Sequence, residues 1–235
     1  MAGRSSAHGQ KLRFLTDQAF EDETTLLLAE YGNEQGQVTA PPIPIDDIVE
    51  LYLKLALVFI DTRKEFGVDD VHGALWVRKR LVGIDQRLDP GTNPAMLGRY
   101  RFTLAHEAGH WLLHRQLFQK TANQLTLLSE NADRPEYICR SGSTEPIEYQ
   151  ANRFASCLLM PKEMIKRAWG EWRRDMDPIY LTDLRAEAGA NVTDDIVFEN
   201  AIRPFAATFE VSAEAMRIRC EGMGLLLRKK EAMLF

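Results

Sequence analysis

The sequence predicts an α+β fold that is mainly helical, with a small sheet of about three strands packed beside one long helix. Apolar residues recur at helical spacing over most of the chain, short β-branched and aromatic runs are confined to residues 57–85, and proline-rich turns separate the segments. Of the 235 residues, 45% are hydrophobic and 27% are charged. These proportions predict a packed core and exclude a collagen-like, low-complexity or disordered chain.

We expect three regions along the chain. Residues 1–38 form an N-terminal arm and a short helix, Thr16–Glu30, whose leucines at 26–28 pack inward. Residues 39–175 form the main domain, and residues 176–235 form a helical C-terminal segment.

The main domain begins with a turn and a small sheet. Three prolines between residues 41 and 44 precede Asp46 and Asp47, either of which can cap a short helix. A basic turn at residues 78–80 then separates two of the predicted strands as a hairpin. The predicted strands are Leu57–Ile60, Ala74–Val77 and Leu81–Asp85.

One long helix follows the sheet. Asn93 suits its N-cap and Pro94 its first helical position, and no proline interrupts the chain from Ala95 to about Gln116. This helix contains the string RFTLAHEAGHWLLH, in which three of the five histidines of the chain lie.

His106, Glu107 and His110 form an HExxH pattern. Residues four apart on a helix have Cβ atoms roughly 6 Å apart, so two imidazoles can bind one zinc ion. Glu107 is rotated by about 100° from His106, which places its carboxylate beside the ion rather than on it. There it can accept a proton from a water molecule, as the general base of a zinc hydrolase does.

A catalytic zinc site needs a third protein ligand, for which the sequence offers three candidates. His114 lies about 12 Å along the helix axis from His106, so a supporting or capping role suits it better. Cys157 lies in an apolar stretch and is more typical of a small buried side chain. Glu148 lies near the start of a second apolar helix that Ser143 or Thr144 caps.

The second helix also offers a supporting side chain. It runs from Pro146 to Pro161, and Asn152 falls one turn after Glu148 on the same side. A carboxylate at Glu148 can complete the zinc site, and Asn152 can hydrogen-bond a ligating imidazole or carboxylate.

Two paired motifs, RFTLAHEAGHWLLH and ExxANRFAxxLLMP, resemble those of the ImmA/IrrE family of metallo-endopeptidases. The resemblance covers roughly Pro41–Pro161 and implies a zincin-like peptidase domain. It implies one Zn²⁺ per chain, held in a gluzincin-like site by His106, His110 and Glu148, with Glu107 as catalytic acid and base. Mn²⁺ is an alternative at such N and O ligands.

The resemblance also implies a substrate class. Members of the family cleave helix-turn-helix repressors and thereby relieve repression in stress or mobile-element responses, so we expect a protein substrate of that kind. The loop Leu117–Ser143 is longer than a helix connection requires, and it either covers the cleft or is disordered. The strand Leu81–Asp85 is expected to be the rim on which an extended substrate pairs.

The C-terminal segment resembles a helix-turn-helix-like FxVSxxAxxxR stretch of the family, from Phe209 to Arg219, with Ser212 as N-cap. Residues 203–230 carry six Lys and Arg against three Glu, a local charge of +3. The small and acidic side chains at the start of the last helix suit base edges poorly. We therefore expect packing or protein docking here, rather than DNA binding.

The net charge, the N-terminus and the cysteines indicate the class of protein and where in the cell it is expected. A net charge of −5 lacks the overall footprint of a nucleic-acid coat. The N-terminus lacks an apolar signal region, the most apolar stretch, 43–60, is interrupted by charges, and three widely spaced cysteines suggest no disulfide framework. We expect a cytoplasmic protein without membrane contact.

Two other functions remain open, a non-proteolytic zinc-stabilised anti-repressor and a DNA-binding regulator. Retention of a base at Glu107 favours hydrolysis over the non-proteolytic anti-repressor, because a purely structural zinc site needs no base. An oxyanion donor beyond the metal is expected from Tyr137, Arg140, Tyr149 or His114.

Overall fold

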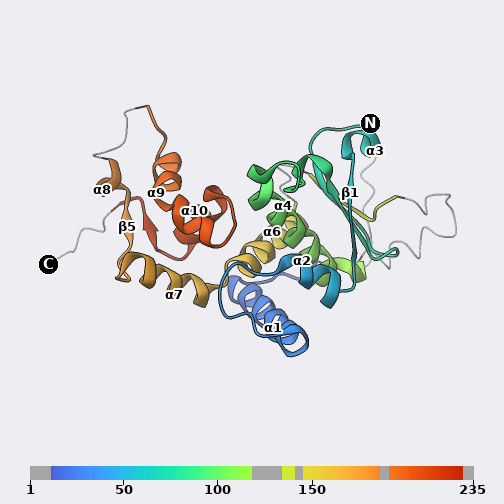
Figure 1. Cartoon of the computed structure of the whole chain (residues 1–235), viewed down its shortest axis with the longest axis horizontal. Coiled ribbons are helices and arrows are strands. Elements are labelled where there is room, and N and C mark those ends of the chain that lie inside the picture. Colours follow the sequence, from blue (N-terminus) through green and yellow to red (C-terminus); the bar gives the residue numbers. More distant parts are fainter. Residues whose placement is uncertain (1–11, 118–133, 141–144, 186–190, 230–235) are drawn as a thin grey trace.

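The computed structural model describes residues 12–117, 134–140, 145–185 and 191–229. Figure 1 shows a mainly helical α+β chain in two halves. One half contains the four-stranded sheet together with α4 and α6, and the other half contains α8, α9 and α10. This arrangement confirms the predicted fold class, an α+β zincin-like domain with a helical C-terminal part. Within the described ranges, no helix is both long and apolar enough to cross a membrane.

The sheet has the strand order β1-β3-β2-β4. β1 and β3 are parallel, and β2 is antiparallel to both of its neighbours. The three predicted strands are present with β2 beginning three residues earlier than expected. A fourth strand, which the sequence analysis treated as loop, completes the sheet. The strands are β1 Ala56–Ile60, β2 Val71–Trp76, β3 Leu81–Asp85 and β4 Tyr137–Arg140.

The expected substrate rim is not at an edge of the sheet. β3, Leu81–Asp85, lies between β1 and β2, so both rows of its backbone hydrogen-bonding groups are already paired. The prediction that a substrate strand adds to β3 is therefore wrong. The sequence showed the hairpin of β2 and β3, but it did not show that β1 pairs with the far side of β3.

The helical elements follow the sequence pattern, although several short segments are 3₁₀- or π-helical instead of α-helical. They are α1 Asp17–Gln35, α2 Ile45–Asp47, the π-helix η1 Ile48–Tyr52, α3 Thr62–Phe66, the 3₁₀ turns η2 Gln86–Leu88 and η3 Pro94–Met96, α4 Leu97–Gly109, the π-helix η4 His110–His114, α6 Pro146–Leu159, α7 Lys162–Arg173, α8 Leu181–Arg185, α9 Asp194–Thr208 and α10 Ala213–Gly222. Two short strands, β5 Ile179–Tyr180 and β6 Leu226–Leu227, pair in parallel.

Several predicted details at helix ends differ from the structure. α1 continues to Gln35, and Leu26 is 55% exposed rather than packed inward. Asp46 and Asp47 lie inside the first turn of α2, where their charge complements the helix dipole instead of capping it. The N-cap of α6 is Glu145, and the expected caps Ser143 and Thr144 lie outside the described residues.

Close packing of α4 on α6 positions the site. A Cβ added at Gly109 would lie 3.1 Å from Phe154 Cδ1 and 3.4 Å from Ala151 Cα. Glycine at this position therefore lets the two helices approach closely. The contact brings the first turn of α6 onto the last turns of the HExxH helix.

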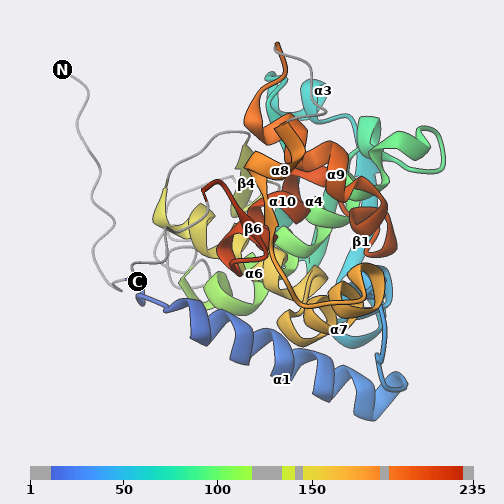
Figure 2. The ribbon, with the colours of Figure 1, turned by 90° about the vertical axis from the view of Figure 1, so that its left-hand side faces the viewer.

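The C-terminal half is tied to the rest of the chain by a buried arginine. Arg219, 3% exposed, donates from Nε to the Met160 carbonyl at 3.1 Å and pairs with Glu21 at 2.7 Å. Figure 2 shows α1 running beneath α7 and α6, where this contact is made. The domain boundaries at residues 38 and 175 stay predictions.

Candidate metal centre

Two histidine rings meet at the end of α4. His106 and His110 are 2% and 0% exposed, and their Nε2 atoms lie 2.9 Å apart. The helix widens from α to π geometry at His110, a local change often found at functional sites. The expected helix to Gln116 is thus present, but its last turns are not regular α-helix.

Glu148 reaches both rings from the first turn of α6. Its Oε1 lies 3.0 Å from His110 Nε2, and its Oε2 lies 3.5 Å from His106 Nε2. Burial raises the pKa of this carboxyl, but the two rings outweigh burial and lower it to about 2. Glu148 is therefore a charged carboxylate although it is only 2% exposed.

The hydrogen-bonding partner of His106 fixes its tautomer. Asn152 Oδ1 lies 2.9 Å from His106 Nδ1. Because an amide oxygen can only accept, Nδ1 carries the hydrogen and Nε2 is left with its lone pair. That lone pair faces Glu148 and His110.

Hydrogen bonds through Arg13, Gln150 and His114 fix the tautomer of His110 in the same way. Gln150 donates from Nε2 to the Arg13 carbonyl at 2.6 Å, which turns its Oε1 toward His114 Nε2 at 3.0 Å. His114 must then donate from Nε2, so its Nδ1 accepts from His110 Nδ1 at 3.0 Å. His110 Nε2 is consequently also without hydrogen.

These donor atoms fit a divalent metal ion. Two bare ring nitrogens and a carboxylate converge within 2.9–3.5 Å, and three Lewis bases repel one another unless a cation lies among them. Without such a cation, His106 takes up a proton instead. Burial lowers the pKa of His106, but the contacts with Cys139 and Glu148 raise it well above its ordinary value.

Glu107 lies beside this cluster and points at the sheet. It is fully buried, and neither carboxylate oxygen has a hydrogen-bond partner in the described part of the chain. Burial raises the pKa of Glu107 to about 8. A Cβ at Gly73 of β2 would lie 2.4 Å from Glu107 Oε1, so a larger residue at this position would displace the carboxylate.

β4 contributes two side chains that the sequence analysis did not place at the centre. The ligand atoms of Cys139, His106 and Glu148 all lie within 4.8 Å of one another. The ring of Tyr137 lies 3.7 Å from the ring of His110, centroid to centroid. The sequence indicates Tyr137 only as a candidate oxyanion donor, and the wide spacing of Cys139 from the two other cysteines gives no sign that it lies near the rings.

The other candidates lie elsewhere. Cys157 is buried at the far end of α6, with its Sγ 3.4 Å from Arg219 Nη1, and it is thus remote from the rings. Tyr149 is 55% exposed. The side chain of Arg140 lies outside the described residues.

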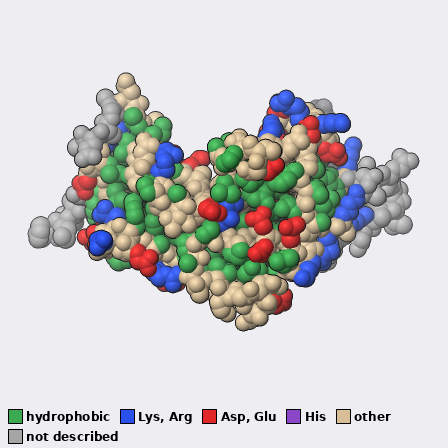
Figure 3. Space-filling view, in the orientation of Figure 1, with side chains coloured by type: hydrophobic (Ala, Val, Ile, Leu, Met, Phe, Trp, Pro, Cys, Tyr) green, Lys and Arg blue, Asp and Glu red, His purple; other side chains and the backbone are tan. Residues whose placement is uncertain are grey.

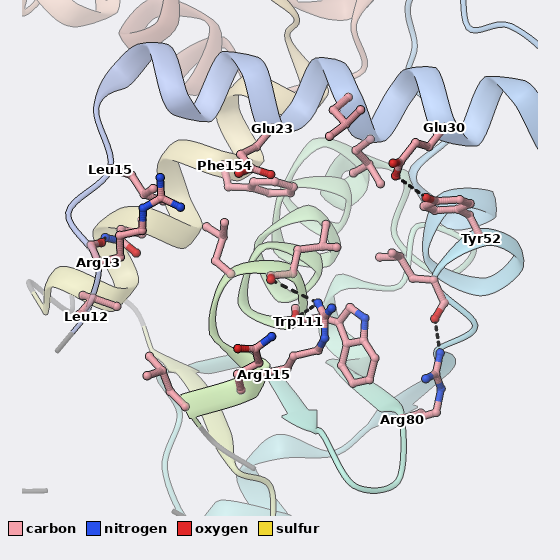
Figure 4. A pocket seen from close by; sticks show the side chains of 18 residues that line it. Leu12, Arg13, Leu15, Glu23, Glu30, Tyr52, Arg80, Trp111, Arg115 and Phe154 are labelled. Carbon is pink, nitrogen blue, oxygen red and sulfur yellow. Dashed lines mark hydrogen bonds between the residues drawn. The ribbon is translucent and has the colours of Figure 1, made fainter. Parts of the chain in front are cut away.

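A separate cavity of about 800 Å³ lies between α1 and η4. Figure 4 shows Trp111 and Arg115 on one side of it and Glu30 and Tyr52 on the other, with Tyr52 donating to Glu30 at 2.6 Å. None of the three converging ligands lines it. Gln150 and Arg13, the two outer residues of the hydrogen-bonded chain that leads to His110, also line this cavity.

Together, the fold and the site define a domain of the metallopeptidase type. The profile of the Peptidase_M78 family, described as an IrrE N-terminal-like domain, matches residues 61–221. The chain belongs to this family. Among curated proteins, none matches it.

One solved structure, described as a Mycobacterium tuberculosis transcriptional regulator, aligns with 92% of this chain at 16% identity and a TM-score of 0.43. The alignment covers 52% of that protein, so the present chain spans about half of its length.

Proposed function

We propose that the protein is a zinc-dependent endopeptidase that hydrolyses a peptide bond in a protein substrate. The observation that carries this proposal is the convergence of two imidazole Nε2 atoms and a buried carboxylate, from His106, His110 and Glu148, beside the buried carboxyl of Glu107. A set of two histidines and one glutamate is a known catalytic zinc site that leaves a coordination position open. Mn²⁺ can also bind such ligands.

When bound, the metal polarises the scissile carbonyl and makes a water molecule more acidic. The chain's own residues prepare that chemistry. Asn152 and His114 accept from, or pair with, the Nδ1 atoms of the two rings and so orient both Nε2 atoms toward the place of the ion.

Glu107 is proposed as the group that accepts a proton from water and returns it to the leaving amine. Its burial raises its pKa to about 8, and a cation beside it lowers that value by favouring the charged form. Between these limits the carboxyl can gain and lose a proton near neutral pH, which general acid–base catalysis needs.

The proposed substrate is a helix-turn-helix transcriptional repressor, whose cleavage relieves repression in a stress or mobile-element response. Support comes from the two motifs that this chain shares with the ImmA/IrrE peptidases. The chain itself offers little surface for DNA. Arg217 contacts Glu199 and Glu221 at 3.0 and 2.7 Å, and Arg228 pairs with Glu221 at 2.7 Å, so these basic charges are already compensated.

The first test combines metal analysis with cleavage of the repressor encoded beside the gene. We expect one zinc per chain, and cleavage that falls about 10²–10⁴-fold in Glu107→Gln. Glu163→Gln, on the exposed face of α7, is the matched control and should keep full activity.

Glu107→Gln should retain its zinc and its fold, because Glu107 is not among the converging ligands. If this variant relieves repression as well as the unaltered protein does, the chain acts by sequestration, and the hydrolase proposal is wrong. Binding to duplex DNA with a steep salt dependence would instead support a DNA-binding regulator.

A further inference from the structure

β4 lies at the sheet edge next to the metal centre. It pairs antiparallel with β2, with Cys139 opposite Gly73 and Tyr137 opposite Leu75. Opposed residues of an antiparallel pair project to the same face, and a Cβ on Gly73 would point at Glu107. Cys139 and Tyr137 therefore both face α4.

The contacts agree with this orientation. Tyr137 packs on His110 at 3.7 Å between ring centroids, and Cys139 is hydrogen-bonded to His106. Neighbouring ligand atoms around a tetrahedral zinc ion with bonds of 2.0–2.3 Å are roughly 3.3–3.8 Å apart. The sulfur of Cys139 and the ligand atoms of His106 and Glu148 all lie within 4.8 Å of one another, which is close to that spacing. His110 is not in this group, so binding of all four ligands to one ion also requires the sulfur to move toward the His110 ring.

Independent support comes from Glu107. Its carboxylate is fully buried and lacks a hydrogen-bond partner in the described ranges, although it lies between β2 and the metal centre. A buried polar group without a partner is costly, and its presence here indicates a place built for a further polar molecule. Cys139 lies beside this site, with its sulfur within 4.8 Å of the ligand atoms of His106 and Glu148.

β4 also fills the position of a substrate strand. β2 is the strand that passes Glu107, and its neighbours in the sheet are β3 and β4. An extended peptide could add to β2 only where β4 now lies. Glu136, just before β4, holds it in place by accepting a hydrogen bond from Val77 N at 2.8 Å.

We propose that Cys139 is a fourth metal ligand, and that β4 thereby holds the chain in a self-inhibited form that opens when β4 is displaced. This inference rests on the proposed function, because it presupposes a metal held by His106, His110 and Glu148. The thiolate closes the coordination position that water needs, and the strand blocks the edge that a substrate needs.

The main test is cobalt(II) titration of the purified full chain, followed by absorption spectroscopy. We expect visible d–d bands together with a thiolate-to-cobalt charge-transfer band in the near ultraviolet. The charge-transfer band should disappear in Cys139→Ala and persist in Cys220→Ala, which removes a buried thiol in α10.

The outcomes separate the two proposals. Cobalt d–d bands without a charge-transfer band in the unaltered protein would overturn the role of Cys139 and leave the metal centre intact. Absence of both bands would overturn the proposed function as well. A charge-transfer band that survives Cys139→Ala would assign the sulfur to another residue and also overturn the inference.

Thiol reactivity gives a second readout that does not require cleavage. With zinc bound, we expect iodoacetamide to modify Cys139 at least about tenfold more slowly than in the metal-free protein, because the coordinated thiolate is not free to react. In Glu136→Ala, which loosens β4 from β2, zinc-loaded protein should react faster than the unaltered protein. Equal rates with and without zinc would contradict the proposal.

Self-inhibition is tested by the rate of repressor cleavage. Cys139→Ala should bind zinc through the remaining ligands and cleave about tenfold faster or more, because the fourth position is then open. If Cys139→Ala retains zinc and cleaves no faster, the thiolate is a purely structural ligand, and the self-inhibited form is ruled out.

Discussion

The hydrogen on Nδ1 of each of the two rings, His106 and His110, determines which ring nitrogen can bind a metal ion. Asn152 and His114 each contact the Nδ1 of one of the two rings at 2.9 and 3.0 Å, so Nε2 is the atom that each ring presents to the proposed metal ion. The chain from the Arg13 carbonyl through Gln150 to His114 reaches into the first described residues of the protein. The orientation of His110 therefore depends on residues outside the HExxH motif.

Removing the acceptor at Asn152 should weaken metal binding. In Asn152→Ala, His106 loses the partner that selects its tautomer, and we expect zinc affinity to fall about 10–100-fold. Competition with a chromophoric chelator measures this loss. Tyr149→Ala, an exposed position on the same helix, is the control, and equal losses in both variants would argue against a role for the Asn152 hydrogen bond.

The absence of a side chain at Gly73 matters as much as any ligand. In Gly73→Ala, the new methyl group would lie 2.4 Å from Glu107 Oε1, so the carboxylate must turn away. We expect cleavage to fall by about 10²-fold or more and stability by about 1–3 kcal/mol, with zinc retained.

Gly222→Ala, where an added Cβ meets nothing within 4 Å, controls for a generic effect of alanine. Kinetics and urea unfolding of both variants measure the difference. Full activity in Gly73→Ala would show that Glu107 does not depend on this close approach.

Helices and strands differ in how far the sequence predicted them. The HExxH helix and α6 were predicted from their apolar periodicity and their prolines. These patterns are local, and local patterns can be read from the chain directly. The preference for Glu148 over the two other candidates for third ligand came from the resemblance of the paired motifs to the ImmA/IrrE family. The structure brings Glu148 to the rings as that preference required.

β4 could not be predicted in the same way. It has four residues, lies within the long connection 117–143, and is stabilised by pairing with β2, more than 60 residues earlier in the chain. Strand pairing at that distance leaves no local signal. Cys139 was therefore missed as a neighbour of the centre. Gly73 was missed as well, because the predicted strand begins at Ala74, whereas β2 begins at Val71; a glycine inside a strand would have indicated a close approach.

We expect Arg219 to hold α10 against the rest of the chain. It pairs with Glu21 of α1 at 2.7 Å and donates to the Met160 carbonyl at 3.1 Å. Arg219→Ala leaves both partners buried or half-buried without compensation, so we expect unfolding free energy to fall by about 3 kcal/mol. Chemical denaturation measures it.

Arg228→Ala provides the matched comparison, because its side chain is 45% exposed and its ion pairs are screened by solvent. We expect it to change stability by less than about 1 kcal/mol. If the two variants lose the same stability, the buried pair of Arg219 is not what fastens the C-terminal half.

Charged side chains are unevenly distributed over the face of the molecule seen in Figure 3. Figure 3 shows Asp and Glu side chains gathered near the centre of one face, between the two halves, with Lys and Arg mostly toward the edges. The net charge is −5. Arginines of the C-terminal segment that had suggested a local basic patch are largely paired with acidic neighbours, Arg217 and Arg219 among them.

The two halves of the molecule are proposed to have different roles. The sheet, α4, η4 and α6 supply every residue proposed to hold the metal or move a proton. The C-terminal helices contact this part through Arg219 and through Gly98, where an added Cβ would lie 2.8 Å from Ser212 N. We infer that the C-terminal half supports the site without contributing to its chemistry.

The most direct test of the central claim is the zinc stoichiometry and affinity of the full chain compared with Glu148→Gln. We predict one zinc per unaltered chain, and binding at least about 100-fold weaker in Glu148→Gln, because the variant loses the charged ligand that closes around the two rings. Unchanged zinc affinity in Glu148→Gln, or no zinc binding by the unaltered chain, would contradict the claim that His106, His110 and Glu148 form a metal centre.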